Sequence, residues 1–339
     1  MNSGLARKFR KALFVIAIFV LALLTGGMTY EVIGRISDSH KYPVRGRMVD
    51  VGGYRLNINC TGVGSPTVIL ESGLGEQAQS WVEVQRGVEG FTRVCSYDRA
   101  GYGRSDPGPQ PRSSAQIAKE LHTLLINSKT PGPYVLVGHS FGGYNVRVYS
   151  GLYRNEVSGV VLVDSSHEDQ ERFEPASVRK TAAGLQTLAP FVPSLRFFGV
   201  LRLRDGLRPT TIPDSKLSEA TMQELSALAL RPNYLPAVLR EYAVLGTDSA
   251  TQVRSAGNLG DLPLIVLTAG RPTDPGNRDL DGFRKAWMEI LQPSLANLSP
   301  RGQQVVVMDS DHMIPYEDPD AIVGAIRSVW TEAHLQKSP

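Results

Sequence analysis

The sequence predicts an α/β protein whose central sheet is mostly parallel, preceded by a segment apolar enough to cross a membrane. Short apolar runs alternate with helical patterns, which is typical of a parallel sheet covered by helices on both faces. The first two strand patterns flank Gly52-Gly53 and therefore predict an opening hairpin. Between Val163 and Leu264, roughly 100 residues show helical patterns and no strand pattern, which predicts an inserted helical cap.

The predicted strands are short runs bounded by turn residues. They cover Met48–Val51, Tyr54–Asn59, Thr67–Leu70, Thr92–Tyr97, Tyr134–Val137, Val160–Val163, Leu264–Leu267 and Val305–Met308. The helical patterns between them cover Ser114–Asn127, Phe141–Tyr153, Asp281–Leu291 and Pro319–His334, with Leu185–Leu207 and Met222–Leu245 inside the insertion. We therefore assign residues 46–335 to one α/β domain with a helical cap at about 165–262.

Length and composition agree with one large globular domain. The chain has 339 residues and is 42% hydrophobic, which is enough to build a sizeable core. Its net charge of +3 and the lack of a dense Lys/Arg block argue against a nucleic-acid partner. Within the cap, 195–207 is basic and amphipathic, and this pattern favours packing between cap helices over contact with a membrane surface.

The N-terminus predicts a membrane anchor. Residues 1–11 form a basic flank without acids, and residues 12–30 are uncharged and largely apolar. As a helix, such a segment spans about 28 Å, close to the thickness of a bilayer core. The basic flank would stay cytoplasmic, so the domain would lie outside the cytoplasm after a linker at 31–45. The alternative is a cleaved signal, because small residues at Thr25-Gly26-Gly27 could form a cleavage site and release a secreted protein.

The chain contains two cysteines, Cys60 and Cys95. No C-x-x-C motif or Cys/His cluster is present, so we expect no structural metal site. In an exported protein the two cysteines could form one disulfide. The other interpretation is that both are small buried apolar residues.

The pentapeptide GHSFG at 138–142 is the candidate nucleophile motif, with Ser140 as the nucleophile. A Gly-x-Ser-x-Gly match alone is weak evidence, because glycine and serine are common. Here an apolar strand pattern runs into Gly138 and a helical pattern begins at Phe141. A sharp strand-to-helix turn needs such small neighbours, and it lifts the serine hydroxyl clear of the sheet.

A serine hydroxyl needs a base, and His312 is the candidate. It follows the last predicted strand, which places it at the same carboxyl edge of the sheet as Ser140. His167 also follows a strand and is the alternative. For the acid that orients the base, the residues leave two candidates open: Asp164 after one strand and Asp274 after the next.

Two backbone N–H groups should bind the oxyanion of an acyl-transfer intermediate. Phe141 directly follows the nucleophile and would supply one of them. The glycine-rich segment 72–75 follows a predicted strand, and the N–H of Leu74 is the candidate for the second. A plain turn is the other interpretation of this segment.

Together, the segments INCTGVGSPTVILESGLG (58–75), CSYDRAGYGRSD (95–106), GHSFGGYNVRVY (138–149) and SDHMIPYEDPDAIVGAI (310–326) resemble the α/β-hydrolase superfamily. The resemblance runs from about Gly46 to Trp330 and is strongest for exported or membrane-anchored bacterial hydrolases. It implies an eight-stranded sheet with the cap between strands six and seven. It also implies that Cys60 and Cys95 lie on neighbouring strands, which favours the disulfide, and that Asp98 and Arg99 are structural.

The resemblance also bears on the acid. Many members place it soon after strand seven, which favours Asp274. Similar sequences that lack an acid there have a strand-six Asp followed by Ser-His-Glu-Asp, and residues 164–169 fit that pattern. We therefore prefer Asp164 and retain Asp274 as the alternative.

These features predict a serine hydrolase that cleaves a carboxylic ester without a metal or organic cofactor. The leucine- and phenylalanine-rich cap favours an apolar group in the substrate. Peptidase, cofactor-free haloperoxidase and acyltransferase activities on the same fold are alternatives, as is a ligand-binding protein without catalysis. Epoxide hydrolase and dehalogenase chemistry is disfavoured, because the resemblance implies an Asp in place of Ser140 for those enzymes.

Overall fold

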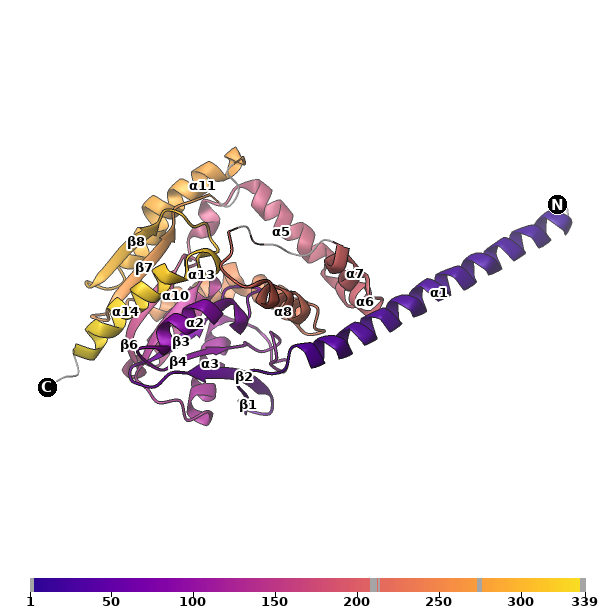
Figure 1. Ribbon diagram of the computed structural model, residues 1–339. Coiled ribbons are helices and arrows are strands. Elements are labelled where there is room, and N and C mark those ends of the chain that lie inside the picture. The colour runs from indigo at the N-terminus through magenta and orange to yellow at the C-terminus, as the bar shows by residue number, and fades with distance from the viewer. Residues whose placement is uncertain (1–2, 208–211, 213, 273–275, 336–339) are drawn as a thin grey trace.

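The computed structural model describes residues 3–207, 212, 214–272 and 276–335. Its core is an eight-stranded sheet in the order β1-β2-β4-β3-β5-β6-β7-β8 (Figure 1). β2 pairs antiparallel with β1 and with β4, and the remaining neighbours pair in parallel. The strands are β1 (Arg47–Asp50), β2 (Arg55–Thr61), β3 (Thr67–Glu71), β4 (Val94–Tyr97), β5 (Tyr134–His139), β6 (Val157–Val163), β7 (Leu264–Ala269) and β8 (Gly302–Val307).

Helices cover both faces of this sheet. One face packs against α2 (Val82–Glu89) and α14 (Pro319–Leu335). The opposite face packs against α3 (Ser114–Asn127), α4 (Phe141–Leu152), α10 (Ala250–Ala256) and α12 (Gln292–Ala296). Two short helices, α11 (Asp281–Ala286) and α13 (Ile314–Glu317), lie in the segments after β7 and β8. This three-layer arrangement confirms the fold class predicted from the sequence.

The central strands show why the sheet is buried on both sides. On β5, Val135 and Val137 pack into the core beneath α2 and α14, whereas Leu136 packs into the core beneath α3 and α4. Successive side chains of a strand point to opposite faces, so an uninterrupted apolar run fills both cores. Because β5 to β8 pair in parallel, the carboxyl ends of β5, β6 and β8 lie at one edge of the sheet, where the candidate site residues follow.

The inserted cap lies between β6 and β7, as predicted. It consists of α5 (Ala176–Leu188), α6 (Val192–Phe197), α7 (Val200–Leu207), α8 (Glu219–Ala229) and α9 (Tyr234–Val244), followed by a π-helical turn that leads into α10. Figure 1 shows α5, α6 and α7 reaching away from the sheet toward the N-terminal helix. The cap therefore lies between the carboxyl edge of the sheet and α1.

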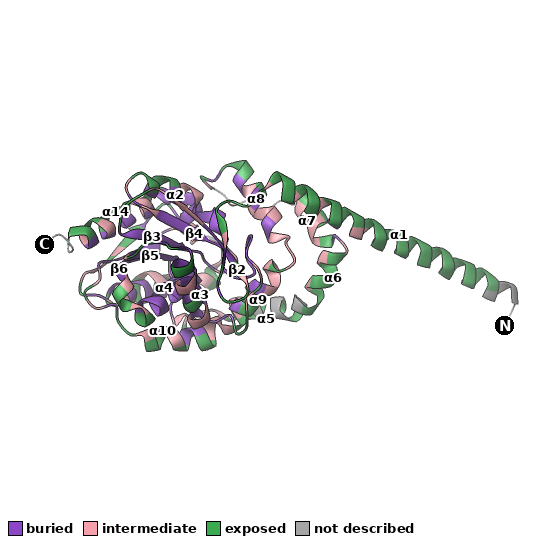
Figure 2. Ribbon diagram, turned by 90° about the horizontal axis from the view of Figure 1, so that it is seen from below, coloured by how far each residue is buried: buried purple, intermediate pink, exposed green. Residues whose placement is uncertain are grey.

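The N-terminal helix α1 (Ser3–Lys41) projects away from the domain, and its first half is exposed (Figure 2). The helical segment Arg7–Lys41 is long and apolar enough to cross a membrane, and its most apolar stretch is not buried in the protein. The helix continues through most of the segment 31–45 that the sequence assigned to a linker. It ends just before Pro43, because the residue preceding a proline is driven out of the helical conformation.

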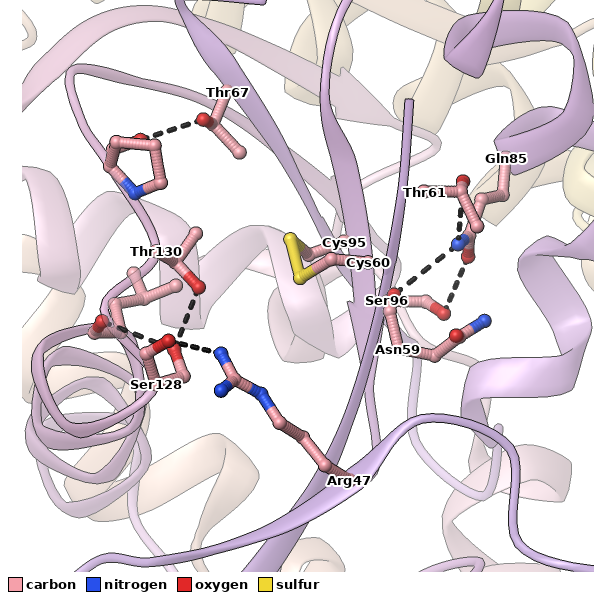
Figure 3. The surroundings of a disulfide bond; sticks show 12 residues. Arg47, Asn59, Cys60, Thr61, Thr67, Gln85, Cys95, Ser96, Ser128 and Thr130 are labelled. Carbon is pink, nitrogen blue, oxygen red and sulfur yellow. Dashed lines mark hydrogen bonds between the residues drawn. A yellow bond between two sulfur atoms is a disulfide. The ribbon is translucent and has the colours of Figure 1, made fainter. Parts of the chain in front are cut away.

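A disulfide joins Cys60 and Cys95, which face each other in the β2–β4 register (Figure 3). Next to it, Gln85 of α2 donates to the Asn59 carbonyl (3.2 Å) and accepts a hydrogen bond from Ser96 (2.7 Å). The covalent link and these hydrogen bonds tie the antiparallel β1–β2 hairpin to the parallel part of the sheet.

We expect the disulfide to stabilise the domain measurably. It closes a loop of 35 residues, for which lost chain entropy predicts about 3–4 kcal/mol. Replacing both Cys60 and Cys95 by serine should lower the free energy of unfolding by that amount in chemical denaturation of the detergent-solubilised chain. Dithiothreitol should lower the wild-type midpoint similarly and leave the double variant unchanged. A wild-type midpoint insensitive to reductant would contradict the prediction.

Candidate active site

Ser140 lies in a sharp turn between β5 and α4, with a left-handed backbone (φ 51°, ψ −122°). This conformation is costly for a residue other than glycine and persists only where the surroundings impose it. A Cβ at Gly138 would collide with the Gly142 carbonyl, and a Cβ at Gly142 would collide with the Glu71 carbonyl. The two glycines are therefore required by the close approach of α4 to β3 and β5.

Asp164 and His312 follow two strands that end at the same edge of the sheet. Asp164 directly follows β6, and His312 lies between β8 and α13. The Nδ1 atom of His312 lies 2.6 Å from Oδ2 of Asp164. The other carboxylate oxygen, Oδ1, accepts hydrogen bonds from Ala269 N (2.9 Å) and Trp287 Nε1 (2.8 Å). Asp164 is thus held from three sides, whereas Asp274 lies outside the described residues.

The two groups shift each other's pKa. Burial raises the pKa of Asp164, but hydrogen bonds from His312, Ala269 and Trp287 and the His312 charge outweigh it, so the net pKa is lowered. Burial lowers the pKa of His312, but the hydrogen bond to Asp164 and its negative charge outweigh this and raise the net pKa. Asp164 therefore stays ionised at neutral pH and stabilises a protonated His312.

Ser140, Asp164 and His312 line one cavity of about 370 Å³. Its apolar wall is formed largely by the segment after β7: Ala269, Pro272, Leu280, Phe283 and Trp287. Polar and charged residues complete the lining: Ser166, Gln170, Glu174, Arg271, Asp281 and Arg284. The cavity is large enough for a small organic ligand beside the serine.

The glycine-rich segment 72–75 lies against the serine turn. A Cβ on Gly73 would come within 3.1 Å of the Ser140 Cβ. Buried Arg99 binds this segment through the carbonyls of Ser72 (2.5 Å) and Gly73 (2.8 Å). Because C=O and N–H point in opposite directions across a trans peptide, the Leu74 N–H points away from Arg99. Phe141 is buried at the first position of α4, directly after Ser140, and Leu74 directly follows Gly73, the residue that lies against Ser140.

Arg99 is the centre of a buried ionic network. It pairs with Glu71 of β3 (2.9 Å) and Glu241 of cap helix α9 (2.8 Å), and its guanidinium lies 4.7 Å from the centre of the Tyr102 ring. Asn145 of α4 also donates to Glu71 (2.9 Å). The network connects the sheet, the glycine-rich segment, the helix after Ser140 and the cap.

A second chain of hydrogen bonds, which sequence reasoning missed, holds the loop that carries His312. Buried Glu76 accepts from Gly73 N (2.7 Å) and lies 2.8 Å from Nδ1 of His139. Nε2 of His139 in turn lies 2.8 Å from the backbone carbonyl of His312. His139 therefore faces away from the cavity and positions the loop. No spacing rule links positions 76, 139 and 312, so only the folded chain reveals this chain of contacts.

The alternative base, His167, is held elsewhere. Its Nε2 lies 2.8 Å from Ser294 Oγ and its Nδ1 accepts from Asp169 N (3.0 Å). Both ring nitrogens thus have partners away from Ser140, and His167 does not line the cavity. Within the described residues, no cluster of three or more His, Cys, Asp or Glu side chains could hold a metal ion.

Comparison with known proteins identifies the family. The model of the alpha/beta hydrolase family matches residues 68–325, which include every strand from β4 to β8. The chain belongs to the alpha/beta hydrolase family. A relative of the family in Bacillus subtilis, the uncharacterized protein YqjL, is 24% identical over 273 residues, which cover 80% of this chain and 87% of that protein.

Solved structures of other alpha/beta hydrolases have the same fold. A thermophilic esterase from Thermogutta terrifontis is similar with a TM-score of 0.60 and 20% identity, covering 85% of this chain and 98% of that one. An epoxide hydrolase from Vigna radiata is similar with a TM-score of 0.63 and 17% identity, covering 86% and 99%. At these identities the likeness concerns the fold, and it does not choose between ester and epoxide substrates.

Proposed function

We propose that this alpha/beta hydrolase cleaves a carboxylic ester through an acyl-enzyme on Ser140. The observation that carries the proposal is the 2.6 Å contact between His312 and Asp164 in the cavity that Ser140 also lines. A hydroxyl in a strained turn, a base and an ionised carboxylate that orients the base are the parts that nucleophilic acyl transfer requires.

In the proposed reaction, Nε2 of His312 takes the proton of Ser140 while Oγ attacks the ester carbonyl carbon. The N–H groups of Phe141 and Leu74 bind the oxyanion. The C–O bond to the alcohol then breaks, and the alcohol leaves with the proton from His312. Water, deprotonated by His312, attacks the acyl-enzyme and releases the carboxylic acid and a free Ser140. Asp164 keeps Nδ1 of His312 protonated throughout.

The apolar wall of the cavity supports a substrate with an apolar group. Leu280, Phe283 and Trp287 line the same cavity as Ser140, together with polar residues such as Gln170 and Glu174. Apolar surface beside the serine favours an acyl or alkyl chain over a charged peptide. Serine at the nucleophile position also favours ester cleavage over epoxide opening, for which the family resemblance implies an aspartate there.

We propose further that α1 is retained as a membrane anchor with the hydrolase domain on the extracytoplasmic side. Its buried Glu31 forms ion pairs with Arg196 of α6 (3.4 Å) and Arg202 of α7 (2.9 Å). Cleavage after the small residues at 25–27 would separate the apolar segment from this packed part of the helix. The intact mass of the mature protein distinguishes the anchor from a cleaved signal.

A fluorophosphonate probe tests the proposed chemistry, because it forms a stable adduct only with an activated serine. We expect stoichiometric labelling of the full chain, with the adduct mapped to Ser140 by peptide mass spectrometry. Ser140→Ala should abolish labelling. Ser166, which lines the same cavity, supplies the matched control: Ser166→Ala should still be labelled. A folded wild-type protein without an adduct on Ser140 would overturn the proposal.

Hydrolysis should show an acid limb set by His312. The base works only when its ring is neutral, and its pKa is raised above the ordinary value of 6.5, so kcat/KM should begin to fall at a pH above that value. In Asp164→Asn the acid limb of the residual activity should lie at lower pH. The hydrogen bond to the Asp164 carboxylate and its negative charge are the main effects that raise the pKa of His312, and the variant loses them. An unshifted limb would contradict this assignment.

A further inference from the structure

A second cavity, of about 480 Å³, lies between the end of α1 and the cap, away from Ser140. Its walls come from residues 32–42 at the end of α1, residues 227–233 at the end of α8 and in the turn that follows, Arg104 after β4 and Arg202 of α7. Four arginines line it against one acid, Asp38: Arg35, Arg104, Arg202 and Arg231. The hydrolase chemistry uses none of these residues.

Among the described residues, Arg202 is the one arginine of the four that has an acidic partner within 4.0 Å. Arg202 pairs with Asp38 (2.8 Å) and with Glu31 (2.9 Å), so the acid of the cavity is already engaged. Within the part of the chain that the structure describes, Arg35 and Arg231 have no acidic partner within 4.0 Å. The cavity therefore carries an excess of positive charge.

Arg104 is a buried cation with unpaired hydrogen-bond donors among the described residues. Its side chain is buried, with the residue only 8% exposed, and its Nε and Nη2 atoms have no hydrogen-bond partner among the described residues. Nearby Asp98 accepts from the backbone N of Arg104 (3.0 Å), and nearby Glu224 is paired with Arg45 (2.9 Å). Burial first, and then the charge of Arg231, lower the pKa of Arg104. A buried guanidinium without acceptors is costly, and a bound anion would remove that cost.

With α1 spanning the bilayer as proposed above, the cap holds this cavity next to the membrane boundary. The α6–α7 corner packs against α1 so closely that a Cβ on Gly27 would collide with the Phe198 carbonyl. Gly27 belongs to the apolar segment 12–30, so this corner lies at the depth of the membrane boundary. At a rise of about 1.5 Å per residue, Arg35 lies about 8 Å beyond Tyr30, within the headgroup layer of a bilayer.

Apolar side chains on the same corner are exposed. Phe197 is 50% exposed, and Leu203 of α7 is 55% exposed. Val32 and Ile36 line the cavity itself, beside the arginines. A phospholipid has an anionic phosphate at one end and apolar acyl chains at the other. It therefore matches a site that combines cationic donors with exposed apolar surface next to the bilayer.

We propose that the junction between α1 and the cap binds the phosphate group of a membrane phospholipid, with Arg104 and Arg231 as its principal ligands. The proposal rests on α1 spanning the membrane and is independent of the hydrolase reaction. A bound lipid would fix the cap relative to the bilayer and orient the cavity of Ser140 toward the membrane surface.

Native mass spectrometry of the full chain in a neutral detergent tests the proposal. The chain is titrated in parallel with dihexanoyl phosphatidylglycerol, with dihexanoylglycerol, which lacks the phosphate, and with inorganic phosphate. We expect one phosphatidylglycerol per chain and at least tenfold weaker binding of the other two. Arg104→Gln together with Arg231→Gln should weaken phosphatidylglycerol binding by at least a further tenfold.

Two controls separate the proposal from loss of folding. Arg231→Gln alone changes a partly exposed residue and should itself weaken lipid binding several-fold, whereas Arg86→Gln on the exposed surface of α2 should not. Equal binding of inorganic phosphate would indicate a site for a free anion and overturn the lipid assignment. Unchanged lipid binding in the folded arginine variants would overturn the site. Fluorophosphonate labelling of Ser140 should persist in every variant, so failure here leaves the proposed hydrolase reaction separately testable.

Discussion

Replacing Asp164 by asparagine is expected to lower kcat for a nitrophenyl ester by about 10⁴-fold, because the amide presents the wrong partner to Nδ1 of His312. In the wild-type protein the carboxylate accepts from His312 at 2.6 Å and is itself fixed by Ala269 and Trp287. Asparagine preserves that shape but removes the charge that stabilises the imidazolium. Steady-state turnover with acyl chains of different length measures the effect.

Asp274→Asn is the matched control for this prediction. It makes the same chemical change at the other acid that the sequence left open, and it should leave kcat close to that of the wild-type protein. If instead Asp274→Asn causes the larger loss, Asp274 is the functional acid and the contact between Asp164 and His312 is only structural. A circular-dichroism spectrum of each variant shows that both remain folded.

Arg99→Ala is expected to lower the free energy of unfolding by about 3–5 kcal/mol, because it leaves two buried carboxylates without their cation. Glu71 and Glu241 both pair with Arg99, and all three side chains are at most 2% exposed. Burial raises the pKa of Glu71, and although the charge of Arg99 opposes this effect, the net pKa is raised. Without Arg99 that pKa should rise further, so the variant should regain stability as the pH falls and the carboxyls bind protons.

Chemical denaturation of the variant at several pH values measures both effects. Arg86→Ala removes an exposed ion pair with Glu83 and should cost at most about 1 kcal/mol, which makes it a matched control. Wild-type stability in Arg99→Ala, with loss of turnover alone, would contradict the structural role and indicate that Arg99 acts on the reaction itself.

The strands and the serine turn could be predicted because their signals are local. The apolar run of β5 and the glycines around Ser140 lie within ten residues of one another. Helix length decides how well a helix can be predicted. The sequence predicts the 14-residue helix α3 with its observed bounds, but it does not predict α2, because the eight residues VEVQRGVE are too short for a clear helical period. The segment 31–41 was assigned to a linker, yet it is helical and packs against the cap.

The acid could not be chosen from the residues alone. Asp164 and Asp274 follow adjacent parallel strands, so chain order alone allows either to lie near His312; Asp164 contacts it, and Asp274 lies outside the described residues. Glu76 and the partners of Arg99 carry no recognisable spacing, since Arg99 and Glu241 are 142 positions apart. The roles of Ser140, His312 and Asp164 stay predictions until the variants are measured.

By itself, the sequence determined the α/β class, the position of the cap, the apolar N-terminal segment, and the positions of the serine and histidine beside predicted strands, because periodicity, glycine geometry and chain order act over short distances. Only the tertiary structure showed that Asp164 contacts His312, how Arg99 and Glu76 hold the glycine-rich segment, and that α1 and the cap enclose a cationic cavity. Those contacts join residues far apart in the chain. Their energies arise from the burial and pairing of charged and polar side chains, which exist only once the sheet and its helices have folded together.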